Sequence, residues 1–187
     1  MIRIELPATG EEIRKLRVGD RVVMDGIIYT GRDAALPKLV KALKGGEAPI
    51  NVMGAAIMHT AVSPAGIAPT SSNKEDIEES IPYLASMGVL VHIGKGKLGD
   101  ETVRALHEAG AVFIVTPPTA ALLTSRVKSM RVAAFEEEGM EAIFELRVKD
   151  IPGIVAAFLG KYGLYGLKKV KDIPGIVAAA GGKSIYG

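Results

Sequence analysis

The order in which apolar and amphipathic segments follow one another most constrains how this chain folds. Short apolar runs at residues 50–58, 89–94 and 111–116 have the length and composition of buried strands. Helical patterns lie between them at residues 73–88, where Pro82 predicts a kink, and at residues 100–110, and both patterns end at a glycine. Strands that alternate with helices predict an α/β layered domain.

The N-terminal segments add further elements. Residues 2–6 alternate apolar and charged side chains, as an edge or half-buried strand does, and Thr9 begins the capping-box pattern of a short helix. Residues 20–31 are interpreted as two short strands that turn at Asp25–Gly26. The run at 32–46 has apolar residues at helical spacing and ends in paired glycines.

The C-terminal part contains a predicted strand pair and an exact repeat. Residues 131–137 and 141–148 are expected to pair and to turn at Gly139. The sequence VKDIPGIVAA occurs at 148–157 and again at 170–179. Two copies are too few for a solenoid, which needs about three or more units. We therefore interpret the repeat as a local tandem duplication; a functional role for the second copy is the alternative. The expected organisation is a domain at residues 1–166 and an extension at 167–187 that repeats 148–157.

Composition excludes several classes of function. The chain has 187 residues and no cysteine, so it forms no disulfide and cannot by itself build a thiolate-ligated metal site or iron–sulfur cluster. No apolar run approaches the roughly 18 residues of a membrane-spanning helix, and the N-terminus lacks the layout of a signal peptide. We therefore expect a cytoplasmic protein. Its net charge of +2 comes from scattered Lys and Arg, which does not indicate nucleic-acid binding.

The stretch SPAGIAPTSSNKED, at residues 63–76, places hydroxyl groups where a helix is expected to begin. Ser72 to Glu75 have capping-box spacing, and an anion can sit where Thr70, Ser71 and Ser72 approach the helix start. Lys74 runs against the preference for acidic residues in a first helical turn. The alternative is an ordinary polar cap with a solvated lysine.

Two further stretches carry cations beside glycines. Arg32 precedes the predicted cap Asp33 and would project from the carboxyl end of a strand, where open α/β sheets bind ligands. Its planar fork suits a carboxylate, although the pattern by itself favours a solvated arginine. Lys95 lies between Gly94 and Gly96, so the backbone can approach a ligand closely, but the full spacing of a phosphate-binding loop is missing.

The three histidines of the chain show no metal-ligand spacing. His92 lies in an apolar run and is expected in the core, and His107 is expected on the surface of a helix. His59 precedes the hydroxyl-rich stretch and could line a site.

Taken in order, these stretches resemble the beta subunit of class I iron–sulfur fumarate hydratases, and the matching subunit of L-tartrate dehydratase. The resemblance covers about residues 15–165. It is carried by GDRVVMDGIIYTGRDAA, GIAPTSSNKED, IGKG and AAFEEEGMEAIFELRVKDIP. The sequence departs from the family at Leu36, where histidine is usual, at Ala68, which replaces a glycine, and at Lys74, which replaces an arginine.

The resemblance implies a three-layer swivelling β/β/α domain and a hydro-lyase that interconverts fumarate and (S)-malate. It implies that Thr70 is the catalytic base and that Arg32, Lys74, Lys95 and Ser71 bind a small dicarboxylate. A [4Fe–4S] cluster would be held by a partner alpha subunit, because this chain has no cysteine. A homodimer of beta chains within a hetero-oligomer is expected. The alternatives are an L-tartrate dehydratase beta subunit and a non-catalytic ligand-binding module on the same fold.

Overall fold

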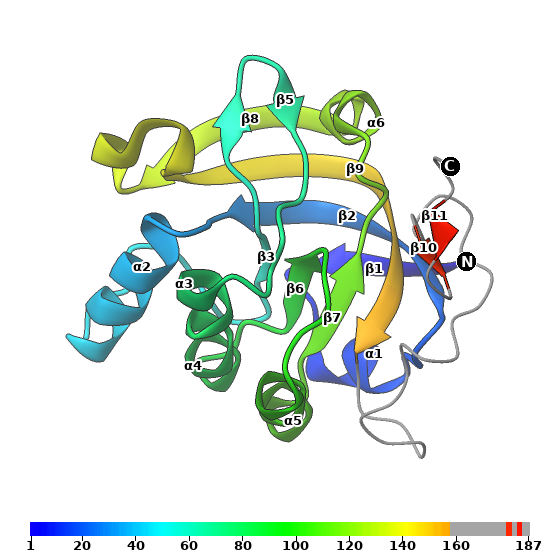
Figure 1. Cartoon of the computed structure of the whole chain (residues 1–187). Coiled ribbons are helices and arrows are strands. Elements are labelled where there is room, and N and C mark those ends of the chain that lie inside the picture. Colours follow the sequence, from blue (N-terminus) through cyan, green and yellow to red (C-terminus); the bar gives the residue numbers. More distant parts are fainter. Residues whose placement is uncertain (158–178, 181–182, 185–187) are drawn as a thin grey trace.

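The computed structural model describes residues 1–157, 179–180 and 183–184, and the predicted alternation of strands and helices is confirmed in it (Figure 1). The main sheet contains β1 (Ile2–Leu6), β2 (Arg21–Thr30), β3 (Ala56–Met58), β6 (Val91–Gly94), β7 (Val112–Val115), β8 (Val127–Ala134) and β9 (Ile143–Ala157). Two short pairs lie outside it, β4 (Val62–Ser63) with β5 (Gly66–Ile67) and β10 (Ala179–Ala180) with β11 (Lys183–Ser184). The helices are α1 (Gly10–Arg14), α2 (Ala35–Lys44), α3 (Glu75–Glu78), α4 (Ser80–Ser86), α5 (Asp100–Ala109), α6 (Ala120–Ser125) and the 3₁₀ helix η1 (Glu136–Glu141).

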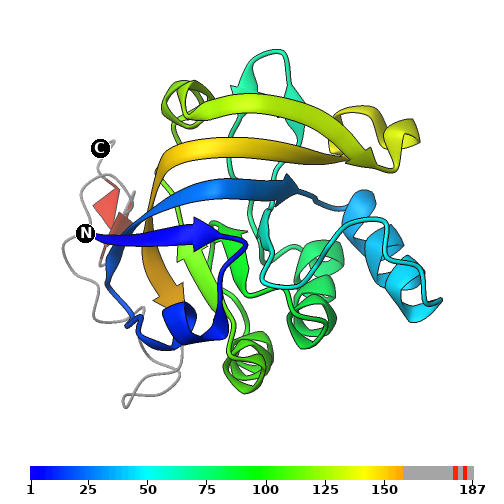
Figure 2. The same ribbon diagram turned by 180° about the vertical axis from the view of Figure 1, so that it is seen from behind.

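The centre of the sheet is a set of parallel strands in the order β2, β3, β6 and β7. Every residue of β3, β6 and β7 is buried, which explains why these strands read as continuous apolar runs rather than alternating ones. Helices α2, α4 and α5 connect them and lie along one side of the sheet in both views (Figures 1 and 2). Because the strands are parallel, their carboxyl ends meet at one edge of the sheet.

Strand β9 gives the sheet its barrel-like shape. It is 15 residues long and pairs antiparallel with β2, with β8 and, near its end, with β7. The pairings from β2 through β3, β6, β7 and β9 therefore return to β2. The main hydrophobic core contains side chains from all five of these strands, among them Met24, Met58, Ile93, Ile114 and Leu146.

The predicted turn at Asp25–Gly26 is wrong. Residues 21–30 form one strand, and the register against β9 shifts between Met24 and Gly26, which marks a bulge. Gly26 has a φ of 107°, and a Cβ added there would lie 2.1 Å from the carbonyl oxygen of Leu6. Asp25 is buried, accepts a hydrogen bond of 2.6 Å from the Asp150 amide and pairs with Arg3. The glycine therefore serves a bulge, which has the same residue preference as a turn.

Most helix boundaries agree with the sequence signals. Thr9 and Glu12 form the predicted capping box, and α5 ends at Gly110 with a φ of 68°. The segment at 73–88 is interrupted as predicted, but it consists of two helices separated at Glu79. Pro82 explains the break, because proline lacks the amide proton that would bond to the carbonyl four residues earlier.

The hairpin at the C-terminal side is confirmed. Strands β8 and β9 pair antiparallel, and η1 connects them with Gly139 at a φ of 60°. On the helical side of the sheet, Leu36 and Leu39 of α2 pack with Ile57 and Leu84 in a second apolar cluster. Helix α5 contributes Leu106 to a third cluster around Phe113, Ala85 and Leu98.

The first copy of the repeat, 148–157, forms the last two thirds of β9. The second copy, 170–179, lies outside the described residues except for Ala179 in β10, and so does the predicted boundary at residue 166. None of the helices in the described part of the chain has the length and apolar character needed to cross a bilayer.

Candidate functional site

The carboxyl edge of the parallel strands collects the residues that the sequence marked for chemistry. Arg32 comes two residues after the end of β2, His59 follows β3 directly, and Lys95 follows β6 directly. Thr116, which is buried, follows β7. Parallel strands place the residues after their carboxyl ends side by side. The strand pattern therefore indicates that Arg32, His59 and Lys95 lie at one edge of the sheet.

Thr70 reaches this edge through a loop that is bonded to the end of β3. Its amide donates to the His59 carbonyl at 2.7 Å, and its hydroxyl donates to the same carbonyl oxygen at 2.8 Å. The following residue, Ser71, pairs with Lys95 in an isolated parallel bridge, and the Ser72 amide donates to the Lys95 carbonyl at 2.8 Å. The loop therefore continues the sheet beside β6 and brings Thr70, Ser71 and Lys95 together.

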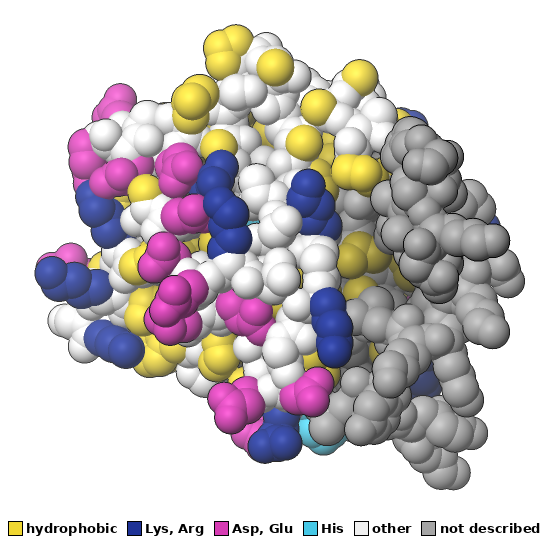
Figure 3. All heavy atoms as spheres, in the orientation of Figure 1, with side chains coloured by type: hydrophobic (Ala, Val, Ile, Leu, Met, Phe, Trp, Pro, Cys, Tyr) yellow, Lys and Arg dark blue, Asp and Glu magenta, His cyan; other side chains and the backbone are white. Residues whose placement is uncertain are grey.

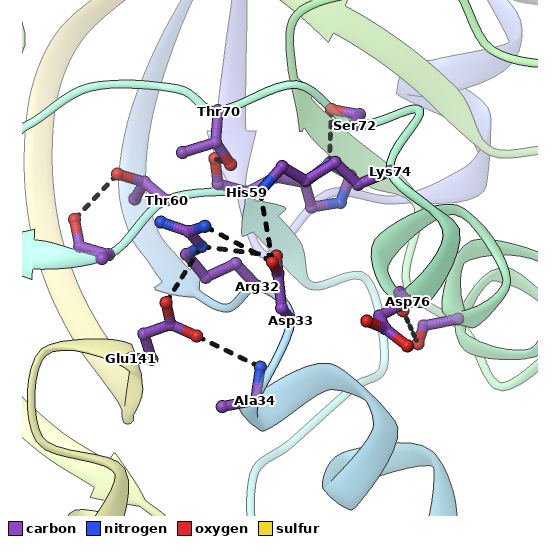
Figure 4. Close-up of polar contacts among 12 residues, drawn as sticks. Arg32, Asp33, Ala34, His59, Thr60, Thr70, Ser72, Lys74, Asp76 and Glu141 are labelled. Carbon is purple, nitrogen blue, oxygen red and sulfur yellow. Dashed lines mark hydrogen bonds and ion pairs between the residues drawn. The ribbon is translucent and has the colours of Figure 1, made fainter.

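A network of two cations and two carboxylates lies beside Thr70 (Figure 4). Arg32 Nε lies 3.2 Å from Glu141 Oε1 and 3.4 Å from Asp33 Oδ1, and Lys74 Nζ lies 3.3 Å from Asp33 Oδ2. The other oxygen of Glu141 accepts from the Ala34 amide at 3.2 Å. Arg32 and Lys74 are thus held in place by Asp33 and Glu141.

The electrostatics of this network keep the Asp33 carboxylate charged. Burial raises the pKa of Asp33, but hydrogen bonds from Arg32 and Lys74 outweigh burial, so the pKa of this carboxyl lies below its ordinary value. The side chain of Arg32 is 21% exposed and that of Lys74 is 50% exposed, so both remain accessible to a small anion. On the face shown in Figure 3, cationic and acidic side chains are interspersed, and no single-sign patch covers it.

Lys95 is exposed and, unlike Arg32 and Lys74, has no ion pair within residues 1–157. The glycines on either side of it are required by packing. A Cβ on Gly94 would lie 1.8 Å from Ser72 Oγ, and Gly96 has a φ of 89°. The loop geometry therefore depends on both glycines, and it presents the lysine to solvent at the strand edge.

Two predictions about caps are wrong. Lys74, not Ser72, occupies the N-cap of α3, no side chain caps this helix, and the helix has only four residues. The N-cap of α2 is Ala34, while Asp33 binds cations instead. Ser72 therefore does not cap this helix, and the nearby cations are the charged groups that an anion would meet.

The predicted locations of His92 and His107 are confirmed. His92 is fully buried in the core, and His107 is exposed. His59 is also fully buried, and its Nδ1 lies 2.7 Å from Ser72 Oγ. Burial lowers the pKa of His59 to about 3; burial and then the neighbouring His59 lower the pKa of His92 well below its ordinary value. Both rings are therefore neutral at physiological pH.

Sequence reasoning missed the roles of Glu141, Asp33 and Ser72. Glu141 lies in η1, far along the chain from Arg32, and no local pattern links the two. Ser72 matched a capping pattern whose spacing carries no information about a partner on β3. Within the described residues, no group of three or more His, Cys, Asp or Glu side chains is placed to hold a metal ion.

Comparison with known proteins identifies relatives whose sequences match most of this chain. Residues 1–159 match the family model described as Fumarase C-terminus. The chain is 34% identical to a Geobacillus stearothermophilus protein named as a class I fumarate hydratase, over 83% of this chain and 32% of the relative. It is 33% identical to a Methanocaldococcus jannaschii protein named as an L(+)-tartrate dehydratase subunit beta, over 80% of this chain and 83% of the relative.

A third relative is the aerobic class I fumarate hydratase of Escherichia coli K12, which is 26% identical over 82% of this chain and 30% of the relative. The chain therefore spans about a third of the length of the fumarate hydratases that it matches, and most of the length of the tartrate dehydratase subunit.

Proposed function

Because this chain belongs to the fumarase C-terminal family, whose named relatives are hydro-lyases, we propose that it is the beta subunit of an iron–sulfur enzyme that interconverts fumarate and (S)-malate. The observation that carries this proposal is the convergence of Thr70, Arg32 and Lys95 at one sheet edge. Family membership supports the reaction class, and the three-layer swivelling description of the domain remains a prediction.

The donor set of this chain does not fit the ligand sphere of a [4Fe–4S] cluster. Such clusters are held by Cys thiolates, and the chain has no cysteine. We therefore assign the cluster to a partner alpha subunit that docks at the edge carrying Thr70, so that the substrate binds between the two chains. The chemistry that such a cluster would supply is Lewis-acid polarisation of the substrate's oxygen groups.

The cations of this chain would recognise the substrate carboxylates. A guanidinium carries five N–H donors, and the contacts of Arg32 with Asp33 and Glu141 engage Nε and Nη2, so other donors can face a carboxylate. Arg32 and Lys74 are neutralised by two carboxylates, so the dianion needs a further positive charge. Lys95 can supply that charge, and the adjacent Ser71 can add a hydrogen bond from its hydroxyl.

Thr70 would accept the proton from the carbon next to the hydroxylated one. In this structure its hydroxyl donates to the His59 carbonyl, an oxygen that cannot take the proton away. Thr70 could therefore act as a base only when Oγ1 turns from this carbonyl toward Arg32 and Lys74 and its own proton passes to solvent. The positive charges of Arg32 and Lys74 would stabilise the alkoxide that remains.

L-tartrate dehydratase is the second candidate function. The relative so named is a separate beta subunit of which this chain covers 83%, whereas the fumarate hydratases are about three times longer than the matched part. The non-catalytic alternative is less well supported. Leu36 is fully buried in the core rather than at the site, and Lys74 keeps its charge and contacts Asp33.

Anaerobic reconstitution with a cluster-loaded alpha subunit of this family tests the proposal. We expect malate to form from fumarate, with no activity from either subunit alone. Oxaloacetate from L-tartrate, without malate from fumarate, would establish the tartrate alternative. Binding of dicarboxylates without turnover of either substrate would support a ligand-binding module. Activity of the isolated chain after metal chelation would overturn the assignment of the cluster to a partner.

A further inference from the structure

We propose that His59 is a positioning residue that fixes the Thr70–Ser72 segment, and with it the Thr70 hydroxyl, at the carboxyl edge of the sheet. The catalytic consequence rests on the proposed function of Thr70 as the base. The positioning itself concerns only this chain and can be measured without turnover.

The main chain of His59 provides the first contact with this segment. Its amide donates to the Ile93 carbonyl at 2.8 Å, so His59 extends the pairing of β3 with β6 by one residue. Its carbonyl oxygen accepts both the amide and the hydroxyl of Thr70, at 2.7 and 2.8 Å. The side chain of Thr70 is therefore held by a residue that is itself bonded to the central sheet.

The imidazole ring provides the second contact, two residues further along the segment. Nδ1 lies 2.7 Å from Ser72 Oγ, and both residues are fully buried. Gly94 makes this contact possible, because a Cβ there would lie 1.8 Å from Ser72 Oγ and 3.1 Å from His59 Nδ1. Ser72 is bonded in turn to the Lys95 carbonyl, so the ring also sets the position of Thr70 relative to Lys95.

Among the described residues, the contact with Ser72 is the hydrogen bond of the His59 ring. Nε2 of His59 has no hydrogen-bond partner among the described residues, and the ring stacks on Phe113 with centroids 6.5 Å apart. His92 offers an internal comparison: its ring centroid is 5.8 Å from that of His59, it is equally buried, and neither of its nitrogens has a partner in the described part. The two histidines therefore differ chiefly in the bond to Ser72.

Four single variants separate positioning from packing. His59→Leu fills the space without a hydrogen bond, whereas His59→Asn places a polar atom near the position of Nδ1. Ser72→Ala removes the bond from its other end. His92→Leu is the matched control, because it changes a neighbouring buried histidine whose ring makes no hydrogen bond to the segment.

The first measurement is amide hydrogen exchange of residues 68–74 in the isolated chain. We expect His59→Leu and Ser72→Ala to accelerate exchange in this segment, His59→Asn to restore most of the protection, and His92→Leu to leave it as in the parent. The second measurement is kinetics in the reconstituted enzyme. Misplacing a reacting group costs on the order of 10- to 100-fold, so we expect His59→Leu to lower kcat by this amount while KM changes little.

The outcomes separate this inference from the proposed function. Equal effects of His59→Leu and His92→Leu on local exchange would overturn the positioning role, and so would parental exchange in Ser72→Ala. If His59→Leu does not fold, His59→Asn and Ser72→Ala still decide the question. If the parental assembly has no hydro-lyase activity, the proposed function fails, and exchange in residues 68–74 alone then decides whether His59 fixes the segment.

Discussion

Arg32 Nε and Glu141 Oε1 lie 3.2 Å apart and join the end of β2 to the 3₁₀ helix before β9. The same carboxylate accepts from the Ala34 amide through its other oxygen. One side chain therefore fixes both the guanidinium and the start of α2, and the orientation of Arg32 depends on a residue from a distant part of the sequence.

Glu141→Gln should raise KM for a dicarboxylate by about three- to tenfold, because a partly buried charged contact that orients Arg32 is weakened. Steady-state kinetics of the reconstituted enzyme measure this effect. Glu137→Gln is the control, since Glu137 lies in the same 3₁₀ helix but pairs with exposed Lys38 at 2.8 Å. An equal KM for both variants would show that Glu141 does not orient the arginine.

Arg32→Ala and Lys95→Ala should mainly weaken substrate recognition. A hydrogen bond to a charged group contributes about 1.5–3 kcal/mol, so kcat/KM should fall roughly tenfold or more. Lys97→Ala is matched to Lys95→Ala, because Lys97 is an exposed lysine of the same loop. Large losses of thermal stability with unchanged kinetics would show that Arg32 and Lys95 are structural.

Thr70→Ala should lower kcat by about 10²–10⁴-fold, the usual contribution of a general base, while dicarboxylate binding persists. Thr70→Ser keeps the oxygen and should retain measurable activity. Exchange of the substrate's C3 hydrogen with solvent is the direct readout in a folded, cluster-competent assembly. Exchange at the parental rate in Thr70→Ala would show that the base is another group, such as Ser71 or Ser72 or a residue of the partner subunit.

The stability of the isolated chain should fall as pH decreases from 7 to 5. The pKa of His59 is about 3 when folded and about 6.5 when unfolded, so the unfolded state binds a proton that the folded state does not. His92 shifts in the same direction. His59 alone should reduce the free energy of unfolding by about 2 kcal/mol over this interval.

Carboxyl groups with lowered pKa values, such as Asp25 and Asp33, add their losses only at lower pH. Urea unfolding at several pH values tests the histidine prediction, and His59→Asn should flatten the curve. Equal stability at pH 7 and pH 5 would show that the rings can be protonated inside the fold.

Deletion of residues 167–187 should leave the fold and the activity largely intact, because the first repeat copy already supplies the end of β9. Circular dichroism and reconstituted activity of the shortened chain provide the measurement. Insoluble truncated protein would show instead that the second copy completes the core.

Much of the fold was predictable because its signals are local. Buried parallel strands are continuous apolar runs, and residues directly after them must lie at the carboxyl edge, which placed Arg32 correctly. The bulge at Gly26 was not predictable, because glycine is equally favoured in a turn. The partners of Ser72 and Arg32 were not predictable either, since His59 and Glu141 reach them only through the tertiary arrangement of β3 and η1.

Strand β9 also constrains the order in which the sheet can be completed during synthesis. It is the last strand of the main sheet in the sequence, yet β2, near the start, pairs with it along most of its length. While the chain emerges from the ribosome, one side of β2 therefore stays without its partner until about 130 further residues have been translated. A separate peptide with the sequence of β9 could occupy that vacant side of β2, so the nascent intermediate could be captured and detected as a complementation event.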